Sequence, residues 1–366
     1  MKKQVPSRRR FIRTFSAGLG AIALNPLYSF GCMESSQKNK LGIALVGLGG
    51  YSSGQLAPAL QQTSNCYLAG VVSGTPSKIK DWQSRYDLPK ENCYNYENFD
   101  EIAKNPAIDI IYVVLPPSMH KEYTIRAAKA GKHVICEKPM AMNAAECAEM
   151  IAACKDAGRM LSIGYRLHFD PHNLEMMRLG QQKVYGKVLS IDTVNGFSYG
   201  GDPDAWRLKK AMGGGPLMDM GIYSIQGSRY TTGEEPTFVT AKDIKTGNPL
   251  FKEVEETLRW ELEFPGGTKA IGETSFAKNY SYLKAQAEKG MFEIQPAFGY
   301  GGQNGKTPKG AMNLPQINQQ ALQMDDFAQC IMQKKVTRVP GEMGMLDMKV
   351  IDAIFRSVKS GQREKV

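Results

Sequence analysis

Histidine and cysteine are scarce in this chain of 366 residues, which contains four histidines and seven cysteines. No Cys-x-x-Cys pair occurs, so the cysteines predict neither a disulfide scaffold nor a zinc ribbon. His168 and His172 are the only closely spaced histidines, and no third ligand stands out beside them, so we expect no bound metal. The sequence also lacks an uninterrupted apolar run of about 20 residues, which excludes a transmembrane span.

The positive charge of the chain is concentrated in its first 40 residues. The net charge is +10, from 46 basic and 36 acidic residues. Eight basic residues and one acidic residue fall within the first 40 positions, so that segment contributes +7 and the rest of the chain +3. Because the remaining chain is nearly neutral and shows no basic and aromatic stripe, we expect no nucleic-acid partner.

The basic segment has the order of an export signal. A twin arginine within residues 7–13 resembles the Tat motif, and a short apolar run from Phe15 to Phe30 follows it. Residues 1–39 are therefore interpreted as a Tat-type signal and spacer, with the Tat machinery as a partner and the periplasm or cell envelope as the destination. Cys32 follows a small residue, as in a lipoprotein processing site, so lipid anchoring there and plain cleavage nearby both stay open.

Strands and helices alternate through residues 40–165. Apolar strands separated by helices of 10–15 residues predict βαβ units and a doubly wound parallel sheet, a Rossmann domain. The expected strands span residues 41–46, 67–72, 108–115, 133–136 and 160–164, and the expected helices begin near residues 53, 76, 119 and 143.

A different rhythm in residues 166–366 predicts an open, mainly antiparallel sheet that forms a substrate-binding and oligomerisation domain. The expected strands span residues 188–195, 238–244, 257–264, 268–276 and 280–287, followed by a loop at 299–315. Helices at about 216–232, 318–334 and 344–360 are expected to cover one sheet face, although the last two could instead pack back on the Rossmann domain. The other face, with Trp260, Leu262 and Phe264, would be an apolar patch, which predicts a homodimer or homotetramer.

The first chemical motif is the turn Gly47-Leu48-Gly49-Gly50-Tyr51-Ser52, directly after the first strand. Glycine at the first and third positions permits a tight turn and lets the backbone approach a pyrophosphate at the start of the following helix. This context predicts a dinucleotide site.

The residues after the second strand indicate which dinucleotide binds. An acidic residue that would bind the ribose 2′-hydroxyl of NAD is missing, and Ser73-Gly74-Thr75 stands there with Lys78 one turn further on. Small polar groups and a cation suit the 2′-phosphate, so NADP is expected in preference to NAD.

Two further motifs could carry proton transfer. Lys138 lies in Cys136-Glu137-Lys138-Pro139 at the carboxyl end of the fifth strand, where ligands bind in this architecture. Asp219 and Tyr223 are four residues apart and share one helix face. A tyrosine beside a cation can accept a hydroxyl proton, and Lys138 is the candidate cation.

Together these residues resemble the Gfo/Idh/MocA oxidoreductase family, in particular its glucose–fructose oxidoreductase branch. The resemblance runs from Leu41 to near Gln362 and includes the glycine turn, the glutamate–lysine–proline block and the Asp219/Tyr223 helix. It implies an NADP-dependent sugar oxidoreductase in which Tyr223 is the base, while Lys138 and Asp219 set its pKa and orient the sugar. The cofactor contacts that it implies are Gly47, Leu48, Gly49, Gly50, Tyr51, Ser73, Gly74, Lys78, Tyr96, Leu115, Pro116, His120, Glu137, Lys138, Arg166, Trp206 and Arg207.

Two alternatives on the same fold stay open. Some relatives use bound NAD to oxidise a sugar at C3, either as a dehydrogenase or to eliminate a glycosidic substituent. A sugar-binding protein without activity is the other alternative, although the presence of Lys138, Asp219 and Tyr223 argues against it.

Overall fold

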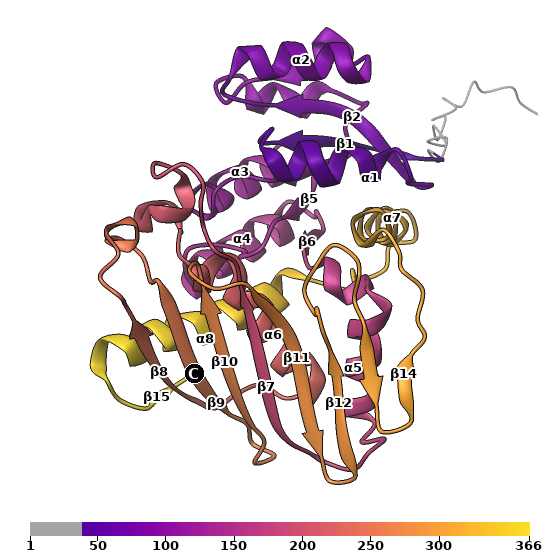
Figure 1. The fold of residues 1–366 in the computed structure, drawn as a ribbon. Coiled ribbons are helices and arrows are strands. Elements are labelled where there is room, and N and C mark those ends of the chain that lie inside the picture. The colour runs from indigo at the N-terminus through magenta and orange to yellow at the C-terminus, as the bar shows by residue number, and fades with distance from the viewer. Residues whose placement is uncertain (1–38) are drawn as a thin grey trace, which may run out of the picture. The chain divides into compact units, whose positions relative to one another are not determined.

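Six parallel strands form the first sheet of the computed structural model, which describes residues 39–366 (Figure 1). The predicted export signal, its twin arginine and Cys32 lie outside the described residues. The spatial order is β3-β2-β1-β4-β5-β6, so the strand order reverses between β1 and β4. The elements are β1 Leu41–Val46, α1 Ala57–Leu60, β2 Cys66–Val72, α2 Pro76–Tyr86, β3 Cys93–Tyr94, β4 Ile110–Val113, α3 Pro117–Lys129, β5 His133–Cys136, α4 Ala144–Asp156 and β6 Leu161–Ile163. This sheet confirms the predicted doubly wound domain.

Alternating side chains of β1 explain why this strand is apolar throughout. Ile43 and Leu45 pack into the core on one side of the sheet, and Ala44 and Val46 pack into the core on the other side. All four side chains are fully buried. Helices therefore cover β1 on both faces of the sheet. β1 and the turn that follows it lie in the middle of the sheet.

The second sheet has nine strands in the order β14-β13-β12-β11-β7-β10-β9-β8-β15. Its central pair, β7 and β10, is parallel, and the other neighbours are antiparallel. The strands are β7 Val188–Gly196, β8 Phe238–Ile244, β9 Thr257–Glu263, β10 Lys269–Ser275, β11 Tyr280–Ala287, β12 Gly290–Ile294, β13 Gly305–Thr307, β14 Gly310–Met312 and β15 Glu364–Lys365. The predicted, mainly antiparallel second sheet is confirmed, and the predicted domain boundary falls between β6 and α5.

Helices cover only one face of the second sheet (Figure 1). α5 (Pro171–Gln181) packs on β12, α6 (Ile222–Thr232) packs on β7 and β10, and α8 (Gly341–Ser360) packs on β8. α7 (Gln319–Met332) instead contacts α1 and β2 of the first sheet. Met324 and Phe327 of α7 are fully buried in that core, so of the two placements left open for this helix, it takes the one on the Rossmann domain and not the one on the second sheet.

The predicted apolar patch on the uncovered face is also wrong. Trp260 and Leu262 of β9, with Phe264 just after it, are at most 4% exposed and pack against the helices. The alternate residues Arg259 and Glu261 point the other way, because successive side chains of a strand face opposite sides of a sheet. The alternation of apolar and polar residues along β9 was correctly predicted. Its apolar side, however, faces the helices and not the uncovered face to which it was assigned.

The segment 299–315 is only partly the predicted loop, because it contains the short hairpin β13–β14. β12, which carries this hairpin, was not predicted either. The strands of the hairpin are three residues long and contain Gly305 and Gly310, so their composition does not differ from that of a turn.

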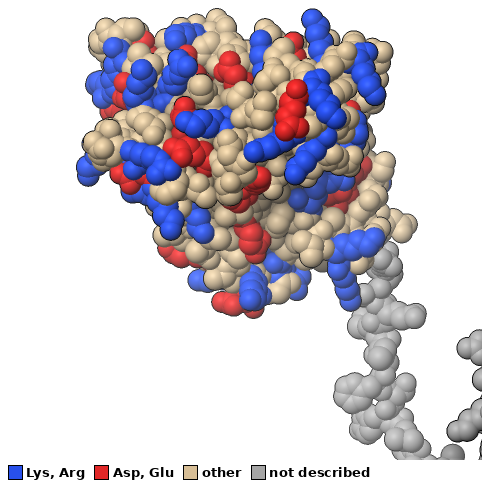
Figure 2. Space-filling model, turned by 90° about the horizontal axis from the view of Figure 1, so that it is seen from below, with Lys and Arg blue, Asp and Glu red and all other residues tan. Residues whose placement is uncertain are grey.

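Charged side chains of both signs are interspersed over the face shown in Figure 2. None of the helices within residues 39–366 is both long enough and apolar enough to cross a membrane.

We expect Gly272→Ala to lower the free energy of unfolding by about 1–3 kcal/mol. A Cβ at Gly272 would lie 2.2 Å from the ring of Trp260, its partner across β9 and β10, and Trp260 is only 2% exposed. Urea denaturation of the purified protein measures the loss. Gly54→Ala is the matched control because no atom lies within 4 Å of its Cβ position, and equal stabilities for the two variants would contradict the packing argument.

Candidate active site

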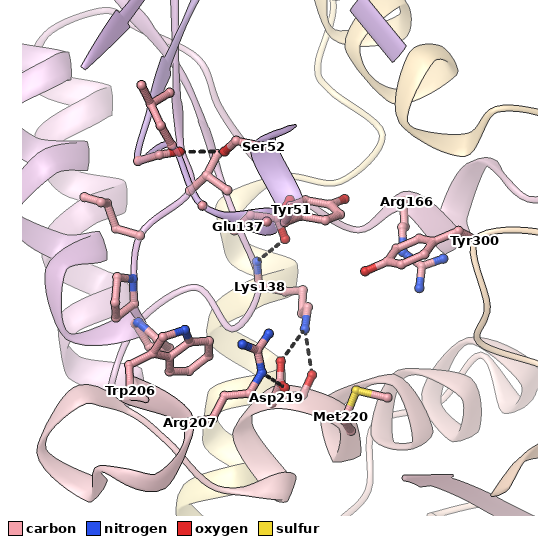
Figure 3. Close-up of a pocket in the computed structure, with 18 of the residues that line it drawn as sticks. Tyr51, Ser52, Glu137, Lys138, Arg166, Trp206, Arg207, Asp219, Met220 and Tyr300 are labelled. Carbon is pink, nitrogen blue, oxygen red and sulfur yellow. Dashed lines mark hydrogen bonds and ion pairs between the residues drawn. The ribbon is translucent and has the colours of Figure 1, made fainter. Parts of the chain in front are cut away.

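A cavity of about 890 Å³ lies at the carboxyl ends of β1, β2, β4 and β5 and extends to residues of the second sheet (Figure 3). The predicted site residues that line it are Gly47, Leu48, Gly49, Gly50, Tyr51, Ser73, Gly74, Lys78, Tyr96, Leu115, Pro116, Glu137, Lys138, Arg166, Trp206, Arg207, Asp219 and Tyr223. The strand order reverses between β1 and β4, which is where open α/β sheets bind their ligands. Residues of both sheets therefore contribute to one cavity.

The turn after β1 leaves room for a pyrophosphate. Gly47 has φ +98°, and a Cβ there would lie 2.4 Å from the carbonyl oxygen of Val114, so glycine is required. Gly49 and Gly50 are exposed, and no atom lies within 4 Å of their Cβ positions. Ser52 Oγ donates to the carbonyl oxygen of Gly47 at 2.5 Å and closes the turn. The open backbone at the start of a helix fits the phosphates of a dinucleotide.

The end of β2 forms a part of the cavity without a carboxylate. Ser73 is buried, and its hydroxyl accepts a hydrogen bond from the backbone of Thr75 at 3.2 Å. A Cβ at Gly74 would lie 2.7 Å from the ring of Tyr96, so only glycine lets this ring pack against the turn. Lys78 lines the cavity in the helix that follows. Glu137 and Asp219 are the acidic residues that line this cavity, and neither follows β2.

Lys138, the partly exposed Arg207 and the buried Asp219 form a charge cluster (Figure 3). Lys138 Nζ donates to the backbone oxygen of Asp219 at 2.6 Å and lies 3.4 Å from its carboxylate, while Arg207 Nε donates to the other carboxylate oxygen at 2.7 Å. Burial by itself would raise the pKa of Asp219, but the positive charges of Lys138 and Arg207 outweigh burial and hold it below its usual value. Asp219 is therefore ionised at neutral pH.

Glycines bring Arg207 to Asp219. Asp219 lies in a π-helical turn, Leu217–Gly221, that precedes α6. The backbone N–H of Gly215 donates to the carbonyl oxygen of Arg207 at 2.9 Å, and a Cβ at Gly214 would lie 2.5 Å from that oxygen. The loop can fold back on itself only with glycine at position 214, which accounts for the glycine run.

Tyr223 lies close to two cations. Lys138 Nζ is 4.7 Å and the guanidinium carbon of Arg166 is 5.0 Å from the centre of the Tyr223 ring, and Phe298 stacks on the ring at 6.1 Å. Tyr223 is only 5% exposed. The hydrogen bonds of the Asp219 carboxylate go to Lys138 and Arg207, so Asp219 acts on Tyr223 through Lys138.

Hydrogen bonds from buried groups fix the position of the Glu137 carboxylate. Tyr112 donates to Glu137 Oε1 at 2.7 Å, and Gln323 of α7 donates to the Tyr112 hydroxyl at 2.9 Å. A Cβ at Gly164 would lie 2.4 Å from Glu137 Oε1, so the glycine after β6 leaves the space that this carboxylate fills. Burial raises the pKa of Glu137 above its usual value, although the charge of Lys138 opposes this effect.

His120 is the one predicted cofactor contact that does not line the cavity. It is 1% exposed, and its ring nitrogens lie 2.7 Å from the carbonyl oxygen of Leu115 and 2.8 Å from that of Pro139. Burial lowers the pKa of His120. The structure places it behind the cavity wall, where it joins the segments that follow β4 and β5.

Tyr300 lines the cavity but was missed at the sequence level. Its ring centre lies 4.4 Å from the guanidinium carbon of Arg166 and 5.9 Å from the ring centre of Tyr51 (Figure 3). Arg166 donates to the carbonyl oxygens of Phe298 and Gly299, and so anchors the loop that presents Tyr300. An isolated aromatic residue between glycines was the only available signal.

No group of three metal-ligating side chains occurs within residues 39–366. His168 and His172 are both buried. Burial, together with the charges of Arg229 and Arg338, lowers the pKa of His168 to about 3, so its imidazole is neutral.

The class of protein follows from three features, namely the strand order, the glycine turn and the cluster of Lys138, Asp219 and Tyr223. They are typical of a dinucleotide-dependent oxidoreductase. Models for the NAD-binding Rossmann domain of an oxidoreductase family and for the GFO/IDH/MocA C-terminal domain match residues 41–165 and 174–295. The chain belongs to the Gfo/Idh/MocA oxidoreductase family and is an NAD(P)-dependent oxidoreductase.

Similar proteins are known in sequence and in structure. The crystal structure of an aldose–aldose oxidoreductase from Caulobacter crescentus, complexed with glycerol, is 42% identical with a TM-score of 0.85 and covers 89% of this chain and 100% of that one. D-xylose 1-dehydrogenase [NADP(+)] of Haloarcula marismortui is 26% identical over 88% of this chain and 92% of its own. Scyllo-inositol dehydrogenase of Lactobacillus casei, solved with NAD(H) and scyllo-inositol, is 19% identical with a TM-score of 0.75 over 89% of this chain and 99% of that one, which shows a shared fold.

Proposed function

We propose that the protein is an exported, NADP-dependent sugar oxidoreductase that oxidises an aldose and returns the hydride to a second sugar. The observation that carries this proposal is the Lys138–Asp219–Tyr223 cluster at the edge of the dinucleotide cavity. The identity of 42% with an aldose–aldose oxidoreductase, over the full length of that enzyme, supports sugars as both donor and acceptor.

The chemistry requires the loss of one proton and one hydride from a sugar carbinol. When bound, NADP supplies the hydride acceptor. Tyr223 is the base that takes the hydroxyl proton, and the cations of Lys138 and Arg166, 4.7 Å and 5.0 Å from its ring centre, stabilise the negative charge involved in the transfer. An aldose oxidised at C1 leaves as the lactone, and the reverse transfers reduce a second sugar to its polyol.

The residues at the end of β2 support the proposed preference for NADP. Ser73 and Lys78 line the cavity there, and the carboxylates that line the cavity belong to Glu137 and Asp219. A 2′-phosphate would thus meet a hydroxyl and a cation without like-charge repulsion.

Export by the Tat machinery is part of the same proposal. It rests on the twin arginine and apolar run within residues 1–39. Tat carries folded proteins, which suits an enzyme whose cofactor is made in the cytosol. The periplasm or cell envelope is the proposed location, with lipid anchoring at Cys32 as one form of retention.

Product analysis by NMR tests the reaction class. We expect protein loaded with NADP to convert a mixture of aldoses to lactone plus polyol. Free sugar and aglycone from a glycoside would support the oxidation–elimination alternative instead. No turnover of any sugar would contradict the proposed function.

Tyr223→Phe should lower turnover by about 10²–10⁴-fold, because a ring without a hydroxyl cannot accept the sugar proton. The affinity for NADP should stay within a few fold, which fluorescence titration measures. Tyr282→Phe is the matched control, since its hydroxyl contacts Asp192 outside the cavity. A wild-type rate in Tyr223→Phe would rule out this residue as the base.

Ser73→Asp should shift the cofactor preference toward NAD by at least about tenfold, or ~1.4 kcal/mol, through repulsion of the 2′-phosphate. Titration of both cofactors against both proteins measures the ratio of dissociation constants. Ser73→Asn, of similar size without charge, should change the ratio much less. An unchanged ratio in Ser73→Asp would place the phosphate-reading group elsewhere.

We also propose a homodimer or homotetramer formed through the uncovered face of the second sheet. This face carries charged pairs such as Lys269 with Glu261, together with the exposed apolar Ile271, which lies opposite Glu261 on the neighbouring strand. Light scattering should give at least twice the chain mass, and Ile271→Asp should shift the protein toward monomer. Leu322→Asp on α7 is the control, and a monomeric wild type at micromolar concentration would refute the interface.

A further inference from the structure

A second cavity, of about 490 Å³, lies at the opposite end of the strands that hold the active site. It is lined by His133 and Leu161, which begin β5 and β6, by the last turns of α4, and by the segment between α7 and α8. β5 leads from His133 to Cys136, and Glu137 and Lys138 follow in the active site. The two cavities share no lining residue, so a ligand of the second would not touch the first.

Positive charge gathers around this second cavity. Lys155, Arg159, Lys334 and Lys335 line it, against the single carboxylate of Glu342. None of these four basic side chains forms an ion pair within residues 39–366, whereas other basic residues such as Arg178 are paired. Lys155 and Arg159 come from the end of α4 and the turn after it, and the adjacent Lys334 and Lys335 from the segment after α7; all but Arg159 are exposed. These like charges repel one another, and an anion between the two segments would relieve that repulsion.

His133 adds a neutral donor to this lining. Its Nδ1 accepts a hydrogen bond from the backbone N–H of Met160 at 3.0 Å, so the proton of the neutral ring lies on Nε2. Burial and the nearby charge of Arg159 lower the pKa of His133 to about 4, so the ring is neutral at pH 7. The imidazole can therefore donate a hydrogen bond without changing the charge of the cavity.

The remaining wall is apolar. Ile151, Met160 and Ile331 line the cavity from three elements, and Val336 at its rim is 83% exposed. An apolar side chain so exposed beside a cluster of cations matches a ligand that has both an anionic and an apolar part. The volume is in the range of small-molecule sites.

We propose that this second cavity binds a small amphiphilic anion, with a phosphate or carboxylate group among Lys155, Arg159, Lys334 and Lys335 and a short hydrocarbon body against Met160 and Ile331. The same chemistry exists in free metabolites and in lipid headgroups. The proposal is for the free small molecule, because the site is a cavity of limited volume.

Calorimetric titration of the full chain, saturated with NADP so that the active site is filled, tests the proposal with octyl phosphate as probe. We expect saturable binding of one molecule per chain, at least tenfold tighter than that of inorganic phosphate or of octyltrimethylammonium. The double variant Lys155→Gln/Lys335→Gln should weaken octyl phosphate binding at least tenfold. Lys90→Gln/Lys309→Gln, which removes two exposed lysines outside both cavities, should not change it.

Several results would overturn the proposal. They are the absence of saturable binding by the correctly folded wild type, equal binding by the two double variants, and equal binding of octyl phosphate and inorganic phosphate.

Co-sedimentation with phosphatidylglycerol vesicles is the second arm of the experiment. Vesicle binding that is lost in Lys155→Gln/Lys335→Gln, without binding of soluble octyl phosphate, would identify a membrane surface as the ligand instead. Sugar turnover, measured in parallel, reports failure of the proposed function separately.

Discussion

The contact between Lys138 and Asp219 is the interaction on which the geometry of the active site depends. Lys138 lies two residues after the end of β5 in the first sheet, and Asp219 belongs to the turn that precedes α6, a helix packed on the second sheet. An ammonium removed from water must find partners, and the carbonyl and carboxylate oxygens of Asp219 supply them. Removal of one partner of a buried pair typically costs about 3–5 kcal/mol. The pair therefore fixes where the sugar-binding elements meet the dinucleotide-binding elements.

Local sequence was sufficient to predict the parts of the site that depend on backbone geometry. Gly47 has a positive φ, and Gly74 and Gly164 are in positions where a Cβ would strike Tyr96 or Glu137. Gly47 and Gly74 belong to short motifs that the sequence displays. The strands at Phe238–Ile244 and Tyr280–Ala287 likewise begin and end where their apolar alternation predicts.

What sequence could not predict was which surface each amphipathic element would meet. The alternation of β9 is clear, but nothing local says which side receives the helices, so Trp260 was assigned to the wrong face. α7 presents Met324 and Phe327 to the first sheet, although it follows the second sheet in the chain. Tyr300 reaches the active site because Arg166 binds the carbonyl oxygens beside it, a contact across 133 positions of sequence in the case of Gly299. Such pairings are set by tertiary packing and leave no local pattern.

The charges that line the active-site cavity agree with the chemistry proposed for it. Its basic lining residues are Lys78, Lys138, Arg166 and Arg207, and its acidic ones are Glu137 and Asp219. Asp219 is already engaged by Lys138 and Arg207. Lys78 and Arg166 form no salt bridge with a carboxylate of the cavity, and they lie beside the turn after β2 and beside Tyr223, respectively. In the proposed reaction the 2′-phosphate of NADP would carry negative charge at the first place, and the sugar oxygen that gives up its proton would gain negative charge at the second. A cavity with a positive excess at both points stabilises a bound cofactor and a developing anion with charges that are already in position, so little reorganisation is needed when the proton moves.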